Sequence, residues 1–384
     1  MFYLLPAKRL LVVIALLCPS ALAATPELET KADLGERLFF DVNLSKNRSQ
    51  SCATCHSPAQ AFTDPRRNGL GGAVSLGDDD ESLGDRNAPT ASYARFSPRF
   101  HQNKQGDYVG GQFLDGREAD LAGQAGGPPL NPIEMGMPDK ASVVQRLQEN
   151  PNYTAAFKAL FGEDIFEDTD KAYAAMTASI AAFEKTELFA PFDSRYDRYL
   201  RGEVELSDEE LLGESLFFSP QFTNCNRCHQ VKMFPGLPEE TFSNYEYHNL
   251  GVPLNTDVRQ ANGKGLDFVD QGLLANKAVT DENQRGKFKV STLRNVAVTG
   301  PYMHNGVFQD LRTVLLFYDK FNNSERKINP ETGQPWRVPE VPESIALETE
   351  EFAAPALKDH EIDALLAFLK TLTDKRYEPL LDNE

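Results

Sequence analysis

Hydrophobic residues recur at helical spacing through most of the chain, whereas the alternation typical of strands is scarce. Apolar positions at helical spacing predict helices over 31–40, 143–147 and 154–161, and the alanine-rich segment 172–183 is helix-prone. Near the end, a helix is predicted to begin at about Asp310, with an apolar stripe at Leu311, Val314, Leu315 and Tyr318. A last amphipathic helix carries Ile362, Leu365, Leu366, Leu369 and Leu372, with Asp359 as its predicted N-cap. The pattern predicts a mainly α fold with few strands.

One short sequence pattern occurs twice. Gly35-Glu36-Arg37-Leu38-Phe39-Phe40 is matched by Gly213-Glu214-Ser215-Leu216-Phe217-Phe218 in the second half of the chain. A capping box from Ser207 to Glu210 starts the helix of the second copy. The repeat predicts two modules of one kind, and the polar stretch 201–206 divides them into domains 24–200 and 201–384.

Two segments lack helical periodicity. Residues 68–89 and 110–138 are rich in Gly, Pro and Asp and predict long ordered loops, which often carry function in compact domains. In the first of them, the run Asp78-Asp79-Asp80-Glu81 is interpreted as a solvated acidic loop, with a cation site as the alternative.

The first 23 residues have the pattern of a secretory signal peptide. The basic pair Lys8-Arg9 precedes the apolar run 10–17 and the small-residue cleavage site 21–23. This run is well short of the ~20 apolar residues that a spanning helix needs, and no later run is longer. We therefore expect an exported, periplasmic protein without a membrane anchor.

Composition and charge narrow the range of partners. The chain has 384 residues, 41% of them hydrophobic, which is enough to bury a large core. Its 57 acidic and 39 basic side chains give a formal net charge of −18. A charge of this sign argues against nucleic acid and anionic membrane surfaces and favours a positively charged protein partner.

Two Cys-x-x-Cys-His motifs use every cysteine that remains after the signal peptide. The first is Cys52, Cys55 and His56, and the second consists of Cys225, Cys228 and His229. In c-type cytochromes such thiols form thioethers to the haem vinyl groups, and the adjacent imidazole binds the iron. Structural zinc and disulfides are the alternatives, which two complete copies disfavour. We predict two covalently bound c-type haems in two cytochrome-like modules.

Beyond the haem motifs, segments 110–117, 131–135 and 301–306 resemble the bacterial di-haem cytochrome c peroxidase superfamily, and in particular its MauG-like branch. The resemblance covers essentially the whole mature chain. It implies that His56 is the proximal ligand of a five-coordinate, high-spin haem that is open to peroxide, and that His229 binds a second, low-spin haem. Tyr318, fourteen residues after His304, would be the other ligand of the second haem; an ordinary core tyrosine is the alternative.

The resemblance also implies a pocket over the open iron, built from Gln124, Pro128 and Glu134. A partly buried carboxylate with a raised pKa suits proton transfer to and from peroxide, which gives Glu134 a catalytic role, with Gln124 orienting peroxide or water. From spacing alone, a helix-terminal or salt-bridged carboxylate is the alternative for Glu134.

A calcium ion between the haems is implied as well. Its ligands would include Asn87 and the backbone carbonyls of Thr299 and Pro301, oxygen donors that suit a hard cation. His304 is expected near a haem propionate. The remaining histidines, with expected surface or packing roles, are His101, His248 and His360.

At some positions this chain differs from the enzymes that it resembles. Ordinary di-haem peroxidases carry a histidine in the loop after the first haem, whereas 57–100 has none, and this difference with Tyr318 favours the MauG-like branch. MauG-like enzymes place a tryptophan between the haems where this chain has Leu114, and another where it has Thr223. The sole tryptophan is Trp336. Charge sharing between the haems and outward hole transfer are therefore both in question.

Three functions fit these features. The favoured one is a di-haem oxidoreductase that uses hydrogen peroxide to reach a high-valent state and oxidises a protein, such as immature methylamine dehydrogenase during maturation of its tryptophan-derived cofactor. The alternative is a peroxidase that reduces hydrogen peroxide with electrons from a small periplasmic cytochrome or cupredoxin. A di-haem electron carrier is disfavoured, since a carrier gains nothing from an open iron. A phenolate at Tyr318 separates the first two, because it would lower the iron potential.

Overall fold

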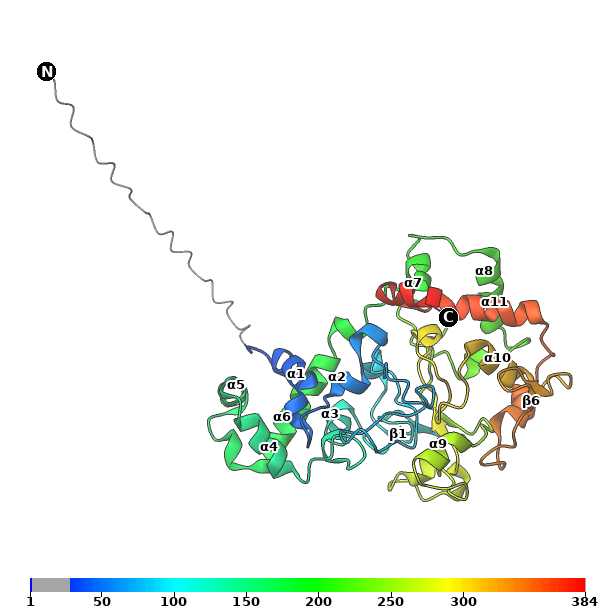
Figure 1. The fold of residues 1–384 in the computed structure, drawn as a ribbon. Helices are drawn as coiled ribbons and strands as arrows, with labels where there is room; N and C mark the ends of the chain where they lie inside the picture. The colour runs from blue at the N-terminus through cyan, green and yellow to red at the C-terminus, as the bar shows by residue number, and fades with distance from the viewer. Residues whose placement is uncertain (2–27, 384) are drawn as a thin grey trace.

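The computed structural model describes Met1 and residues 28–383, so the predicted signal peptide, 1–23, lies outside the described residues apart from Met1. The fold is mainly α, as predicted (Figure 1). Its α-helices are α1 (Lys31–Phe39), α2 (Cys52–Cys55), α3 (Leu121–Ala125), α4 (Lys140–Gln148), α5 (Pro151–Phe161), α6 (Thr169–Glu184), α7 (Arg195–Leu200), α8 (Asp208–Phe217), α9 (Thr256–Ala261), α10 (Leu311–Asp319) and α11 (Asp359–Lys370). In the described part of the chain, none of them is long and apolar enough to cross a bilayer.

Short strands form isolated antiparallel pairs instead of a continuous sheet. The pairs are β1 (His101–Gln102) with β2 (Tyr108–Val109), β3 (Tyr247–His248) with β4 (Phe288–Lys289), and β5 (Ile328–Asn329) with β6 (Gln334–Pro335). In the β3–β4 pair, Tyr247 lies opposite Lys289 and His248 opposite Phe288. This pairing brings side chains from distant parts of the sequence to one place.

Two large hydrophobic cores lie at opposite ends of the molecule. The N-terminal core runs from Leu34 to Phe189 and is built mainly by α1, α4, α5 and α6, whereas the C-terminal core runs from Tyr196 to Leu372 and is built mainly by α8, α10 and α11 (Figure 1). Tyr196 belongs to α7, which ends at Leu200 on the N-terminal side of the predicted boundary, yet Tyr196 packs in the C-terminal core. The division into 24–200 and 201–384 stays a prediction.

The repeated sequence pattern forms the same close helix crossing in both cores. Helix α1 crosses α6, and α8 crosses α11. A Cβ added at Gly35 would lie 1.9 Å from the carbonyl oxygen of Ser179, and one at Gly213 would lie 1.9 Å from that of Ala364. Only glycine permits such backbone contact, so the predicted repeat is a structural repeat.

The predicted helices are observed at their expected places, with two corrections in the last one. Helix α11 ends at Lys370, so Leu372, which was predicted within it, lies beyond its end. The capping box from Ser207 to Glu210 is present at the start of α8. Asp359, however, is the first residue of α11 and not its N-cap. The Glu361 carboxylate accepts a hydrogen bond from the Lys358 backbone N–H at 2.7 Å. A side chain of the first turn thus provides a partner for a backbone N–H group at the start of the helix.

The acidic run in the first long loop is only partly solvated. Asp79, Asp80 and Glu81 are exposed, as expected for a solvated loop. Asp78 is buried, and the interpretation was wrong for this residue: its carboxylate accepts hydrogen bonds at 2.6 Å from the hydroxyls of both Ser45 and Ser49. A buried carboxylate needs such donors, and here they tie the loop to the segment before the first Cys-x-x-Cys-His motif.

Candidate haem sites

The two Cys-x-x-Cys-His motifs fold alike. Each forms one helical turn, closed by backbone hydrogen bonds of 2.9 Å from His56 to the Cys52 carbonyl and from His229 to the Cys225 carbonyl. The four cysteines of the described residues are free thiols, which removes the disulfide alternative. No group of three or more His, Cys, Asp or Glu side chains among the described residues is arranged to hold a metal ion.

Both motif histidines present the same nitrogen for metal binding. Their Nδ1 atoms lie 3.1 Å and 3.0 Å from backbone carbonyls, that of Phe62 for His56 and that of Phe242 for His229. Because a carbonyl only accepts, Nδ1 carries the hydrogen and the Nε2 lone pair is left for a metal. Burial lowers the pKa of the His56 imidazole and lowers that of His229 to about 4, which favours the neutral form that binds iron.

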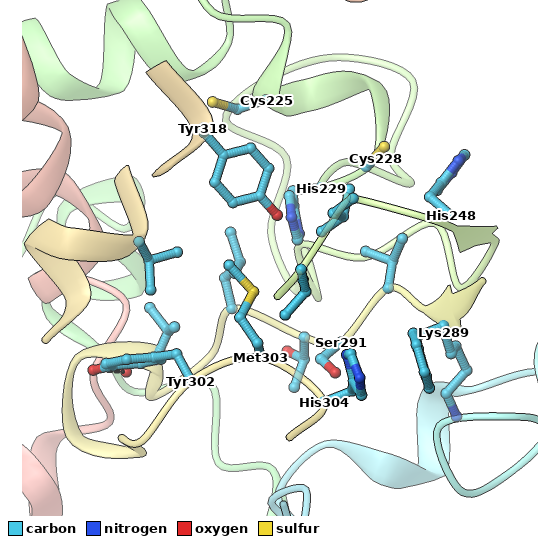
Figure 2. Close-up of a pocket in the computed structure, with 18 of the residues that line it drawn as sticks. Cys225, Cys228, His229, His248, Lys289, Ser291, Tyr302, Met303, His304 and Tyr318 are labelled. Carbon is cyan, nitrogen blue, oxygen red and sulfur yellow. Dashed lines mark hydrogen bonds between the residues drawn. The ribbon is translucent and has the colours of Figure 1, made fainter. Parts of the chain in front are cut away.

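A cavity of about 380 Å³ opens beside the second motif. Cys225, Cys228 and His229 line one side of it, and the Tyr318 hydroxyl points toward the His229 ring, with Met303 nearby (Figure 2). Burial raises the pKa of the Tyr318 phenol above its usual range. Much of the remaining lining is apolar: Leu250, Val252, Leu293, Val296, Leu311, Val314 and Leu315. Two thiols, an imidazole and an apolar cavity together fit a c-type haem.

The apolar stripe of α10 lies between this cavity and the C-terminal core. Leu311, Val314, Leu315 and Tyr318 all line the cavity and also pack in the C-terminal core, to which Phe317 belongs as well. The predicted common direction of the four side chains is correct. An apolar stripe packs equally well against protein or against a hydrophobic cofactor, so periodicity alone does not tell the two apart.

The loops that follow each motif are also equivalent. Gln112 pairs with Glu118 as Tyr302 pairs with Phe308, each in an isolated antiparallel bridge. The aspartates that cap the next helices, Asp120 and Asp310, keep the same spacing. By the same spacing, the position of Tyr318 in the second half corresponds to Pro128 in the first. A proline side chain has no atom that can bind iron, whereas a phenol has one.

The predicted pocket residues of the first site come from one short region. Gln124 lies on α3, and Pro128 lies in the 3-10 turn Pro128–Leu130 that follows. Glu134 is partly buried, and its carboxylate accepts a 2.7 Å hydrogen bond from the Asn131 side chain. Burial raises the pKa of the Glu134 carboxyl. Burial is also the main cause of the raised pKa values of the Cys52 and Cys55 thiols, with a smaller contribution from the nearby Glu134 charge.

The predicted calcium ligands line a second, small cavity. Asn87, Thr299 and Pro301 surround a space of about 10 Å³ together with Asp64 and Ser75. The Asn87 backbone N–H donates to the His304 carbonyl at 2.8 Å. The first long loop and the loop before α10 thus meet at this small cavity.

Leu114 and His304 line the large cavity from opposite modules. The His304 ring stacks on Phe288 with centroids 3.7 Å apart, and its Nε2 lies 3.8 Å from a carboxylate oxygen of Glu340. Leu114 is 8% exposed, and its carbonyl accepts the Lys289 backbone N–H at 2.9 Å. These contacts bring the loops after both motifs together at one wall of the cavity.

Sequence reasoning missed two cationic or titratable groups of the cavity. Lys289 is partly buried in its wall and donates to the Gly111 carbonyl, and burial lowers the pKa of its amine to about 8 (Figure 2). A partly buried amine suits an anionic group such as a haem propionate. His248, expected at the surface or in packing, also lines the cavity. The pairing of β3 with β4 places both Lys289 and His248, and no local sequence pattern predicts this pairing.

Residues 29–205 match the family described as di-haem cytochrome c peroxidase. The chain is 51% identical to the methylamine utilization protein MauG of Paracoccus denitrificans over 96% of both chains. It is 32% identical to the cytochrome c peroxidase Ccp of Escherichia coli, covering 72% of this chain and 50% of that protein. The diheme peroxidase BthA of Burkholderia thailandensis matches with a TM-score of 0.79 and 32% identity, over 90% of this chain and 86% of that one. A MauG-like protein associated with microbial copper homeostasis matches with a TM-score of 0.65 and 33% identity, over 91% of each chain.

Proposed function

Because this chain belongs to the di-haem cytochrome c peroxidase family and is a homologue of MauG along nearly its whole length, we propose that it uses hydrogen peroxide to oxidise a protein in the periplasm. The proposed substrate is immature methylamine dehydrogenase or a related protein, oxidised at tryptophan side chains. The observation that carries the proposal is the Tyr318 phenol facing His229 across the large cavity (Figure 2). A phenolate ligand lowers the iron potential, which makes the second haem a poor acceptor from ordinary carriers.

Two haems would be held by Cys52 with Cys55 and by Cys225 with Cys228. When bound, the haems supply the binding and reductive cleavage of peroxide. His229 and Tyr318 would hold the iron of the second haem. His56 would hold the iron of the first haem, and Pro128, at the place equivalent to Tyr318, would supply no ligand, which would leave that haem open to peroxide. The absence of histidine from 57–100 supports the same asymmetry.

Glu134 and Gln124 have proposed roles at the open position. The Glu134 carboxylate takes a proton from bound peroxide and returns it to the departing oxygen. Its raised pKa, caused by burial, supports this assignment. Gln124 orients peroxide or water with its side-chain amide.

Four exposed apolar side chains close to the second motif in the sequence support a protein as the reductant. Phe222, Val231, Met233 and Phe234 are exposed by 45%, 53%, 81% and 62%. Exposed apolar patches mark protein interaction sites, and these four side chains flank Cys225 and Cys228 in the sequence. We propose that the protein substrate docks there.

A calcium ion is proposed in the small cavity lined by Asn87, Thr299 and Pro301. The side-chain oxygen of Asn87 and the carbonyl oxygens of the other two are hard ligands. An ion at this place would tie the proposed domains 24–200 and 201–384 together. His304, adjacent to this loop, is proposed to contact a haem propionate.

The second candidate function is reduction of hydrogen peroxide with electrons from a small periplasmic cytochrome or cupredoxin. Leu114 and Thr223 favour it, because neither side chain can carry a hole as tryptophan does. The two functions differ in their reductant.

Incubation of the purified protein and peroxide with immature methylamine dehydrogenase should produce the visible absorption of the mature quinone cofactor. Rapid oxidation of a reduced cytochrome or cupredoxin, with no change in the immature enzyme, would establish the second function instead.

Leu114→Trp is expected to lengthen the lifetime of the oxidised state that forms after peroxide addition. Leu114 lines the cavity between the two halves, and an aliphatic side chain forces oxidising equivalents to cross in one longer step. The measurement is the near-infrared charge-resonance band and its decay in both proteins. Overpacking of this kind costs about 1–3 kcal/mol, so thermal unfolding is measured beside it.

Leu114→Phe is the matched control, since it adds an aromatic ring of similar size that is much harder to oxidise. A longer lifetime in Leu114→Trp but not in Leu114→Phe identifies hole transfer as the cause. A strong band in the unaltered protein that neither replacement changes would show that another residue connects the haems.

A further inference from the structure

A buried tyrosine joins the two halves of the protein through a carboxylate. Tyr93 is 1% exposed, and its hydroxyl donates to Asp374 Oδ1 at 2.6 Å across 281 positions of sequence. Asp374 is fully buried, and its other oxygen accepts the side-chain N–H of Asn295 at 2.8 Å. The phenol oxygen also accepts the Phe192 backbone N–H at 3.1 Å. The phenol and the carboxylate are therefore held in a fixed, dry contact.

Such a pair suits loss of an electron together with a proton. An oxidised phenol that kept its proton would be a buried cation, and burial disfavours charged groups. Transfer of the proton to the adjacent Asp374 carboxylate neutralises both groups. The Arg294 guanidinium, 5.4 Å from the Tyr93 ring, would repel that cation further. Burial raises the pKa of Asp374, which makes its carboxylate a better proton acceptor than an exposed one.

The position of the pair matters as much as its chemistry. Tyr93 lines the same cavity as Leu114, His229 and Tyr318. Another buried tyrosine, Tyr196, also donates to a carboxylate, with its hydroxyl 2.7 Å from Glu214, but it packs in the C-terminal core and does not line the described cavity. Of these two similar pairs, only the Tyr93 pair borders the cavity beside the second motif.

We propose that Tyr93 is a redox relay of this enzyme and supplies the oxidisable side chain that Leu114 does not. The Tyr93 phenol gives one electron to the peroxide-oxidised haems and its proton to the Asp374 carboxylate, which leaves a neutral tyrosyl radical and a neutral carboxylic acid. An electron from the protein substrate then reduces the radical, and the proton returns from Asp374. The relay rests on the proposed use of peroxide.

The test is electron paramagnetic resonance of the haem-loaded protein, frozen at short times after peroxide addition. We expect an organic radical signal that narrows when the protein is made with ring-deuterated tyrosine. Tyr93→Phe should abolish this signal, and Asp374→Asn, which keeps the phenol but removes the proton acceptor, should abolish it as well. Tyr196→Phe is the matched control and should leave the signal unchanged, because it removes an equally buried phenol away from the cavity.

The outcomes separate the relay from the proposed function. If peroxide leaves the haem absorption spectrum unchanged, both are overturned, since Tyr93 then has no oxidant. If the spectrum changes but no tyrosyl signal forms, or the signal survives in Tyr93→Phe, only the relay is overturned. Should Tyr93→Phe fail to fold, a signal that persists in Asp374→Asn overturns the relay, and its loss with unaltered haem spectra supports it.

Discussion

Glu134→Gln is expected to slow the reaction with peroxide by ~10²-fold or more, the usual contribution of a positioned acid–base group. Glutamine keeps the size of the side chain and can still contact Asn131, whose amide lies 2.7 Å from the carboxylate, but it takes up no proton. Both haem spectra should therefore remain as in the unaltered protein. Stopped-flow absorbance after mixing with peroxide measures the rate.

Glu184→Gln is the matched control for this effect. Glu184 is also a buried carboxylate near Cys52, and burial raises its pKa to about 8, but it lies on α6 and not in the loop with Pro128. Its replacement should leave the peroxide rate close to that of the unaltered protein. Equal rates in Glu134→Gln and the unaltered protein would make Glu134 a structural carboxylate.

The same rate should depend on pH in a stated direction. Because burial raises the pKa of Glu134, its base form is lost as the pH falls through this raised value. The rate of the unaltered protein should therefore decrease toward acidic pH over a range that lies above the usual titration of a glutamate. Glu134→Gln should lack this decrease, whereas Glu184→Gln should retain it.

Tyr318→His is expected to keep a low-spin second haem but to raise its potential and suppress the oxidised state that forms after peroxide. The physical reason is charge: a neutral imidazole stabilises highly oxidised iron less than an anionic phenolate does. Spectroelectrochemical titration of both proteins measures the potential. Tyr302→Phe is the control, because Tyr302 also lines the cavity while its hydroxyl donates to the Val296 carbonyl at 3.0 Å. An unchanged potential in Tyr318→His would point to Met303, which shares the cavity, as the ligand.

Local sequence patterns predicted much of the fold. The helices, the repeat around Gly35 and Gly213, and the two Cys-x-x-Cys-His turns depend on neighbours within a few positions, where periodicity and motif spacing are informative. The same holds for the capping box at Ser207. The direction of Tyr318 could also be predicted, because side chains four residues apart share one face of a helix.

What the sequence did not reveal depends on contacts between distant segments. Lys289 enters the cavity wall through the pairing of β3 with β4, and Tyr93 finds Asp374 across 281 positions. The sequence around one member of such a pair does not predict which distant residue it will contact. Asp78 was misjudged for the same reason, since an acidic run shows charge but not the hydroxyls of Ser45 and Ser49 that bury one of its members.

The most direct test of the proposed enzyme is electron paramagnetic resonance of the purified ferric protein, before any peroxide is added. The two motifs are alike, but Tyr318 faces one and Pro128 holds the equivalent place at the other. We therefore expect one low-spin signal from a haem with two protein ligands and one high-spin signal from a haem with an open position, in equal amounts. Two low-spin signals without a high-spin component would contradict an open peroxide site, and with it the proposed function.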